Sequence, residues 1–120
     1  MMKLNHLDLQ VTDVQAVRAF IETFFDFHCA YARTELAILT DETGFELAIS
    51  NLSKATEVQY PQDFHIGFVV AEVAQVQALY THLKEAGYTM KFDLQKAGPN
   101  LAFQCLGPDQ IPVEVRAALR

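Results

Sequence analysis

The predicted secondary-structure elements of this chain follow the same order twice. In the first half, a strand, a helix and three further strands are predicted at 4–11, 14–25, 27–33, 36–41 and 45–50. In the second half, the same order is predicted at 64–70, 73–86, 88–94, 101–106 and 112–116. This is an internal repeat of element order. The chain is therefore predicted to be α+β, built from two βαβββ modules.

A short echo in sequence supports the repeat. His6-Leu7-Asp8-Leu9 precedes Asp13-Val14, and His65-Ile66-Gly67-Phe68 precedes Glu72-Val73 at the same spacing. Residues 52–62 show no periodicity and contain Pro61, which is typical of a linker. We therefore expect one domain over 1–120, with modules at 1–51 and 63–120. A helix can cover only one face of each sheet, so the two free faces can pair around a cavity.

Charge and composition narrow the classes of function. Fifteen acidic residues outnumber nine basic ones, and no basic stripe occurs. Binding to nucleic acid or to an anionic membrane therefore has no electrostatic driving force. No apolar run approaches the length of a membrane span, and the N-terminus becomes polar too early for a signal peptide. We expect a cytoplasmic protein in which Cys29 and Cys105 are buried thiols, although a disulfide between them stays an alternative.

Four residues with ligand chemistry alternate with the apolar residues of the predicted strands. In the first strand of the first module, His6 points to the face that Leu7 and Leu9 do not occupy. In the last strand, Glu46 points to the face that Phe45 and Leu47 do not occupy. The second module places His65 and Glu114 in its first and last strands. We expect all four at equivalent places of the two modules, on the faces away from the helices.

Two imidazoles and two carboxylates form a mixed nitrogen and oxygen ligand set. Such a set suits a divalent Ni, Co, Mn, Fe or Zn ion and lacks the thiolates of most structural zinc sites. Four protein ligands on an octahedral ion leave two positions open, where a metal can polarise a carbonyl or enediolate oxygen. Glu46 or Glu114 could then move a proton as the catalytic group.

Simpler interpretations exist for each residue alone. A single strand histidine is usually a hydrogen-bonded side chain, Glu46 can be a solvated residue beside a turn, and Glu114 can pair with Arg116 or Lys91. Two other histidines, His28 and His82, fit the pattern less well and are expected to be structural or exposed. Arg33 and Arg116 could meet an anionic substrate group, but exposed strand-end charges are the simpler interpretation.

Four segments give the chain a resemblance to a known family. They are NHLDLQVTDVQAVRAF, TGFELAIS, FHIGFVVAEVAQVQALYTHLKEAGY and GPDQIPVEV, and together they span nearly the whole chain. Their order resembles the vicinal oxygen chelate superfamily, which includes glyoxalase I, bleomycin-resistance proteins, fosfomycin-resistance proteins and extradiol dioxygenases. The resemblance implies curved sheets around a cavity and a metal held by His6, Glu46, His65 and Glu114, a set similar to that of bacterial-type glyoxalase I.

The resemblance implies a metal-dependent lyase or isomerase for a small substrate with two neighbouring oxygens. The alternatives are a non-catalytic protein that sequesters a small molecule or antibiotic, as bleomycin-resistance proteins do, and an Fe(II) extradiol dioxygenase. Glyoxalase I usually has an Arg four residues after the first His, where this chain has Gln10, so glutathione recognition is in doubt. Chains of this size in the family commonly pair, so a homodimer is expected.

Overall fold

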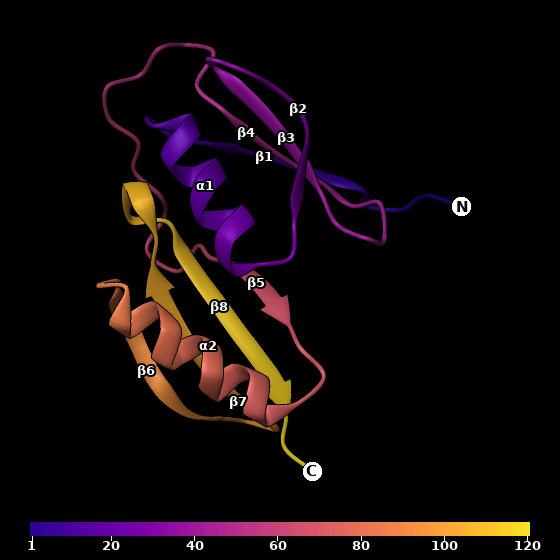
Figure 1. Ribbon diagram of the computed structural model, residues 1–120, viewed down its shortest axis with the longest axis vertical. Helices are drawn as coiled ribbons and strands as arrows, with labels where there is room; N and C mark the ends of the chain where they lie inside the picture. The colour runs from indigo at the N-terminus through magenta and orange to yellow at the C-terminus, as the bar shows by residue number, and fades with distance from the viewer. The chain divides into compact units, whose positions relative to one another are not determined.

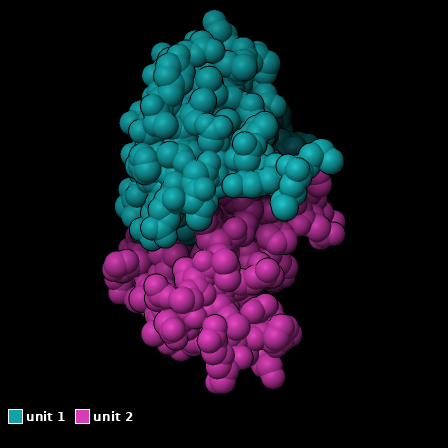
Figure 2. Space-filling view, turned by 90° about the vertical axis from the view of Figure 1, so that its right-hand side faces the viewer, with its two compact units in different colours: residues 1–59 teal, residues 60–120 magenta.

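The computed structural model describes all 120 residues, and these form two compact units, residues 1–59 and residues 60–120 (Figure 2). The boundary falls inside the segment 52–62, which contains no helix or strand. The elements of the first unit are β1 (His6–Gln10), α1 (Val14–Phe24), β2 (His28–Arg33), β3 (Leu36–Thr40) and β4 (Glu46–Ser50). The first predicted βαβββ module is confirmed.

The second unit repeats this order (Figure 1). Its elements are β5 (Ile66–Val69), α2 (Val73–Glu85), β6 (Thr89–Ala97), β7 (Asn100–Leu106) and β8 (Pro112–Ala118), with a short 3-10 helix at Pro108–Gln110. Each unit contains one four-stranded sheet, with the order β1-β4-β3-β2 in the first and β5-β8-β7-β6 in the second. The predicted α+β class is confirmed.

Pairing within each sheet brings the first and last strands of a unit together. β1 runs parallel to β4, and β5 runs parallel to β8, while the other neighbours are antiparallel. Parallel strands need a long connection between them. Here the helix and two intervening strands provide that connection. The two strands that carry the candidate ligands of a unit are therefore neighbours, although 35 residues of chain lie between β1 and β4 and 42 between β5 and β8.

One face of each sheet packs against the helix of its own unit (Figure 1). In the first unit, the buried apolar side chains of the sheet are Leu9, Val11, Ala37, Leu39, Leu47 and Ile49. α1 contributes Val14, Val17, Phe20 and Ile21, which recur at helical spacing. Its N-terminus is capped by Asp13, whose carboxylate accepts a hydrogen bond from the Ala16 amide at 3.0 Å.

The core of the second unit follows the same design. Val76 and Leu83 of α2 are buried, together with sheet side chains that include Ala102, Phe103, Cys105, Val113, Val115 and Ala117. Gly87 ends the helix with a φ of +94°, a backbone conformation that glycine adopts without a steric cost. Because alternate residues of each strand face the helix, the residues between them lie on the open face.

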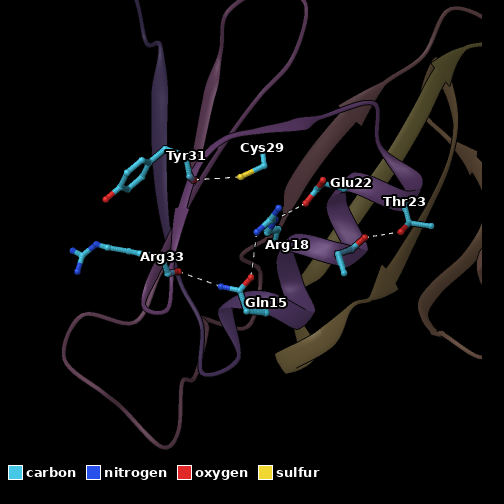
Figure 3. Close-up of polar contacts among 8 residues, drawn as sticks. Gln15, Arg18, Glu22, Thr23, Cys29, Tyr31 and Arg33 are labelled. Carbon is cyan, nitrogen blue, oxygen red and sulfur yellow. Dashed lines mark hydrogen bonds and ion pairs between the residues drawn. The ribbon is translucent and has the colours of Figure 1, made fainter.

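A polar contact joins the outer strand of the first sheet to its helix (Figure 3). Gln15 of α1 donates a hydrogen bond from its amide nitrogen to the Arg33 carbonyl at 3.2 Å. Arg18 pairs with Glu22 at 2.7 Å on the surface of the same helix. In β2, the Cys29 thiol donates to the Tyr31 carbonyl at 3.3 Å. The Gln15–Arg33 contact joins β2 to α1. The strand itself has a register irregularity between Cys29 and Tyr31.

The structure differs from the sequence prediction in several places, of which three bear on the site and the core. β6 extends to Ala97 rather than ending at residue 94, because it forms a long hairpin with β7. β5 begins at Ile66, so His65 lies just before the strand. Cys105 is buried but Cys29 is only partly so, and both are free thiols. Burial raises the pKa of the Cys105 thiol to about 11, so this side chain is an unreactive core residue. Neither helix has the length and apolar character needed to cross a bilayer.

Candidate metal centre

The first pair of candidate ligands lies on the open face of the first sheet. His6 is the first residue of β1, and Glu46 is the first residue of β4, directly opposite it in the parallel register. Both are exposed, because the buried residues of these strands, Leu9 and Leu47, face the helix. No ion pair joins the two side chains. The structure therefore brings this His and Glu side by side, as predicted, without a direct contact between them.

The turn before Glu46 is fixed by an aspartate. Asp41 accepts hydrogen bonds from the amide nitrogens of Thr43 and Phe45 and from the Thr43 hydroxyl, at 2.7–3.1 Å. These donors, the Thr43 hydroxyl first, lower the pKa of the Asp41 carboxyl below its ordinary value. Because Phe45 is the residue before β4, this turn sets where Glu46 begins the strand.

The second pair is in contact. His65 Nε2 lies 4.0 Å from Glu114 Oε2, and the same carboxylate oxygen lies 3.9 Å from an Arg116 nitrogen. The Glu114 side chain is 21% exposed, against 38% for His65 and 53% for Arg116. Glu114 is thus the more enclosed member, with a cationic side chain on one side and an imidazole on the other. The structure brings His65 and Glu114 together.

Both imidazoles are oriented by an oxygen that lies just before them in the chain. His6 Nδ1 is 2.8 Å from Asn5 Oδ1, and His65 Nδ1 is 3.1 Å from the Asp63 carbonyl oxygen. An oxygen acceptor requires a proton on Nδ1, which leaves Nε2 with its lone pair available. Metal-binding histidines characteristically donate their other ring nitrogen to a carbonyl or carboxylate oxygen in this manner. Nothing in the sequence pattern had indicated these two contacts.

The two glutamates are not at equivalent register positions. Val11 donates its amide proton to the Ser50 carbonyl, and Val70 donates to the Arg116 carbonyl, so Ser50 and Arg116 correspond. Glu46 precedes Ser50 by four residues, whereas Glu114 precedes Arg116 by two. The expectation that all four residues occupy equivalent places is therefore wrong for the glutamates, although it holds for the histidines. Glu114 pairs with Gly67 across the strands, and not with a residue at the level of His65.

The chemistry of the second pair suits a divalent metal. Two donor atoms on one metal, each bonded at about 2.1 Å, are between roughly 3 and 4.2 Å apart. The 4.0 Å between His65 Nε2 and Glu114 Oε2 lies within this range. Gly67 lies beside the carboxylate, where an added Cβ would be 3.8 Å from Glu114 Oε2, an ordinary contact distance. No three His, Cys, Asp or Glu side chains are grouped closely enough to hold a metal by themselves. The candidates therefore form two pairs, one in each unit.

Two hollows on the open face of the second sheet meet at Glu114. One, of about 270 Å³, is lined by His65, Gly67, Phe68, Val69, Glu114 and Arg116. The other, of about 410 Å³, is lined by Phe92, Gln95, Lys96, Ala97, Ala102, Phe103, Gln104 and Glu114. A further hollow of about 600 Å³, at the start of α1, contains none of the four candidate ligands. Glu114 thus lines both of these hollows of the second unit.

Several residues that the sequence prediction had considered have other contacts. His28 and His82 are exposed, as expected. Arg33 pairs with Glu35 at 3.2 Å, and Lys91 donates to the Gln62 carbonyl at 2.7 Å rather than to Glu114. Ser50 donates a hydrogen bond to Asp8 at 2.7 Å on the open face of the first sheet, a polar contact that the prediction did not include.

The chain matches known proteins over nearly its whole length. The model for the Glyoxalase/Bleomycin resistance protein/Dioxygenase superfamily matches residues 3–115. A solved structure described as a possible glyoxalase from Bacillus cereus is 34% identical, with a TM-score of 0.85, and the match covers 96% of this chain and 98% of that one. No curated protein matches this chain in sequence.

Two solved structures of lower identity share the fold. A genomically encoded fosfomycin resistance protein from Listeria monocytogenes is 20% identical with a TM-score of 0.77, and the match covers 99% of this chain and 95% of that one. Lactoylglutathione lyase from Agrobacterium tumefaciens is 13% identical with a TM-score of 0.77, and the match covers 96% of this chain and 92% of that one. Proteins with different names thus have this architecture, and the fold alone selects none of their activities.

Proposed function

Because this chain belongs to the Glyoxalase/Bleomycin resistance protein/Dioxygenase superfamily, we propose that it is a metal-dependent lyase or isomerase. Its substrate would be a small molecule that offers two neighbouring oxygens to the metal. The ligands would be His6, Glu46, His65 and Glu114. A divalent Ni, Co, Mn, Fe or Zn ion suits this set of nitrogen and oxygen donors.

The observation that carries the proposal is the shared orientation of the two imidazoles. In each, Nδ1 is held by an upstream oxygen, and Nε2 is left as the free acceptor. A purely structural role would not require both histidines to have Nδ1 held by an oxygen and Nε2 left without a proton. Both Nε2 atoms belong to residues on the open faces, where a ligand can approach. Metal binding is the function that uses the feature in both units.

The two carboxylates differ in how firmly they are held. Glu114 contacts both His65 and Arg116, whereas Glu46 is exposed and has no ion pair. A bound metal would supply Lewis-acid polarisation of a substrate oxygen. Glu46, as the less constrained carboxylate, is the better candidate to accept and return a substrate proton, while Glu114 stays in place. Glu46 and Glu114 are both candidates for this catalytic role, and the contacts of Glu114 favour Glu46.

Metal loading tests the proposal directly. We expect the protein, incubated with Ni²⁺ or Co²⁺ and then dialysed, to retain about one ion per chain, because two His and two Glu side chains provide four ligands. Elemental analysis of the dialysed protein measures this ratio. If the protein retains no transition metal at micromolar concentration, the proposal of a metal-dependent enzyme is wrong.

The competing function would then be sequestration of an apolar small molecule. One observation favours it, namely that large apolar side chains are exposed on the open faces. Phe92 is 50% exposed and Tyr31 is 52% exposed. Binding of an aromatic compound by metal-free protein would support this alternative, and oxygen-dependent ring cleavage by Fe(II)-loaded protein would support a dioxygenase.

The glutathione adduct of methylglyoxal is expected to be a poor substrate. Gln10 is a neutral amide that donates to the Ser53 hydroxyl at 3.0 Å. It cannot supply the charge-assisted hydrogen bond that an arginine gives to a carboxylate. We therefore expect turnover of this adduct by the metal-loaded protein to stay well below about 1 s⁻¹, the lower end of typical enzyme rates. Faster turnover in a spectrophotometric assay would show that glutathione is recognised in another way.

A further inference from the structure

An unsatisfied polar atom lies beside Glu114. The side-chain oxygen of Gln104, Oε1, is buried and has no hydrogen-bond partner. Buried polar atoms nearly always have a partner, because leaving one without a hydrogen bond costs about 1–3 kcal/mol. This oxygen is the only buried side-chain nitrogen or oxygen in the chain that lacks one. Such an atom beside a candidate ligand calls for an explanation.

The register places Gln104 between an aromatic residue and the candidate metal ligand. Gln104 of β7 is opposite Glu114 of β8 on one side and opposite Phe92 of β6 on the other. Side chains directly opposite in neighbouring strands share a face and lie about 5 Å apart. All three residues line the same hollow of about 410 Å³. The side chain that carries the unsatisfied oxygen therefore forms part of the wall of this hollow.

The strand beside Gln104 is shaped irregularly. β6 has register shifts on both sides of Phe92, between Met90 and Phe92 and again between Phe92 and Gln95. Such irregularities bend a strand and redirect its side chains, and they occur often next to active sites. Phe92 is left 50% exposed, with its ring available to an apolar group. An apolar surface, an unpaired acceptor and a carboxylate thus follow one another across the open face.

We propose that Gln104 determines substrate specificity by accepting a hydrogen bond from the molecule bound beside Glu114. This inference rests on the proposed metal site and adds the substrate class. The substrate carries an O–H or N–H donor next to its chelating oxygens and an apolar or aromatic group that contacts Phe92. A molecule without the donor leaves the buried oxygen unpaired and therefore binds more weakly.

Two chelating probes that differ in one donor test this proposal. Benzohydroxamic acid and N-methylbenzohydroxamic acid both bind metals through two neighbouring oxygens and carry a phenyl ring, but only the first has an N–H. Affinities of both probes are measured by calorimetry on Co²⁺-loaded wild type and on Co²⁺-loaded Gln104→Met. The Met side chain has a similar length and no acceptor oxygen. Gln104→Leu is the second variant if Gln104→Met fails to fold.

The expected result compares the preference for one probe over the other in wild type and in Gln104→Met. The preference of wild type for the N–H probe should exceed that of Gln104→Met by about tenfold, the effect of one buried hydrogen bond and its unpaired counterpart. The comparison cancels any intrinsic difference between the probes. Metal affinity should be the same in both proteins, because Gln104 is not among the proposed ligands. An equal preference in both proteins overturns the proposal, and so does failure of both probes to bind.

Loss of the proposed function gives a different result. If wild type retains no Co²⁺, the metal-dependent enzyme is excluded, and the same two probes are titrated into metal-free protein. A preference for the N–H probe that depends on Gln104 then keeps the assignment for a sequestering protein. Equal affinity of wild type and Gln104→Met for the N–H probe in metal-free protein overturns the role of Gln104 as well.

Discussion

His65→Ala is expected to weaken the binding of Co²⁺ or Ni²⁺ by more than about 100-fold. The variant removes the Nε2 that lies 4.0 Å from Glu114 Oε2, and with it one of the two contacting donors in the second unit. Even the outer partners of metal-binding histidines contribute about 10–100-fold to affinity, so a direct ligand should contribute more. Glu114→Gln should have a comparable effect, since a neutral amide is a weaker ligand than a carboxylate. Competitive titration against a chelator measures the change.

Matched variants separate the ligand from general effects of substitution. His82→Ala removes an exposed histidine of α2 that contacts neither pair, and Glu85→Gln neutralises an exposed carboxylate of the same helix. Both should leave metal affinity unchanged. Asn5→Ala removes the acceptor that orients His6 and should weaken binding by about 10–100-fold without deleting a ligand. Unaltered affinity in His65→Ala, with an intact fold by circular dichroism, would exclude His65 as a ligand.

Mixing two inactive chains should restore metal binding if the site is shared within a homodimer. We expect His6→Ala and Glu114→Ala each to lose metal binding when alone. In an exchanged dimer, His6 and Glu46 of one chain would join His65 and Glu114 of the other. A mixed dimer would then contain one intact site and one site that lacks two ligands. Metal retention should rise from near zero toward one ion per mixed dimer.

The mixing experiment has a clear opposite outcome. If His6, Glu46, His65 and Glu114 of a single chain form each site, every chain in the mixture lacks one ligand, and mixing restores nothing. Sedimentation of the wild type provides the control, because a strictly monomeric protein excludes any shared site. A mixture of wild type with His82→Ala, two metal-binding chains, shows whether the exchange conditions themselves release metal.

The fold followed from the sequence wherever one face of an element is buried. Leu9 of β1 and Val11, just after that strand, alternate with polar residues, and Val14, Val17 and Ile21 recur at helical spacing in α1, so both elements could be predicted. The end of β6 could not be predicted from the sequence. Gln95 and Lys96 are exposed in the hairpin with β7, and a strand solvated on both faces leaves no periodic signal.

The candidate site was only partly predictable, for related reasons. Alternation places His6 and Glu46 on the open face, but a shift of the pairing register by two residues keeps every side chain on the same face, so alternation alone does not decide which residue lies opposite which. The offset of Glu114 relative to Glu46 therefore appeared only in the structure. The role proposed for Gln104 had one signal in the sequence, a lone amide within the apolar strand LAFQCL, and its significance depends on the missing partner.

The parallel pairing of first and last strands has a consequence for how each unit folds. β1 can dock on β4, and β5 on β8, only after the chain between them has closed a long loop, and such nonlocal contacts form late. β5 is an edge strand of only four residues, so it is weakly anchored to its sheet. An ion bound across His65 and Glu114 would stabilise the docked edge strand and would lower the equilibrium population of the opened edge by a factor that grows with the affinity for the ion. Metal occupancy and the local stability of the second unit would then be coupled.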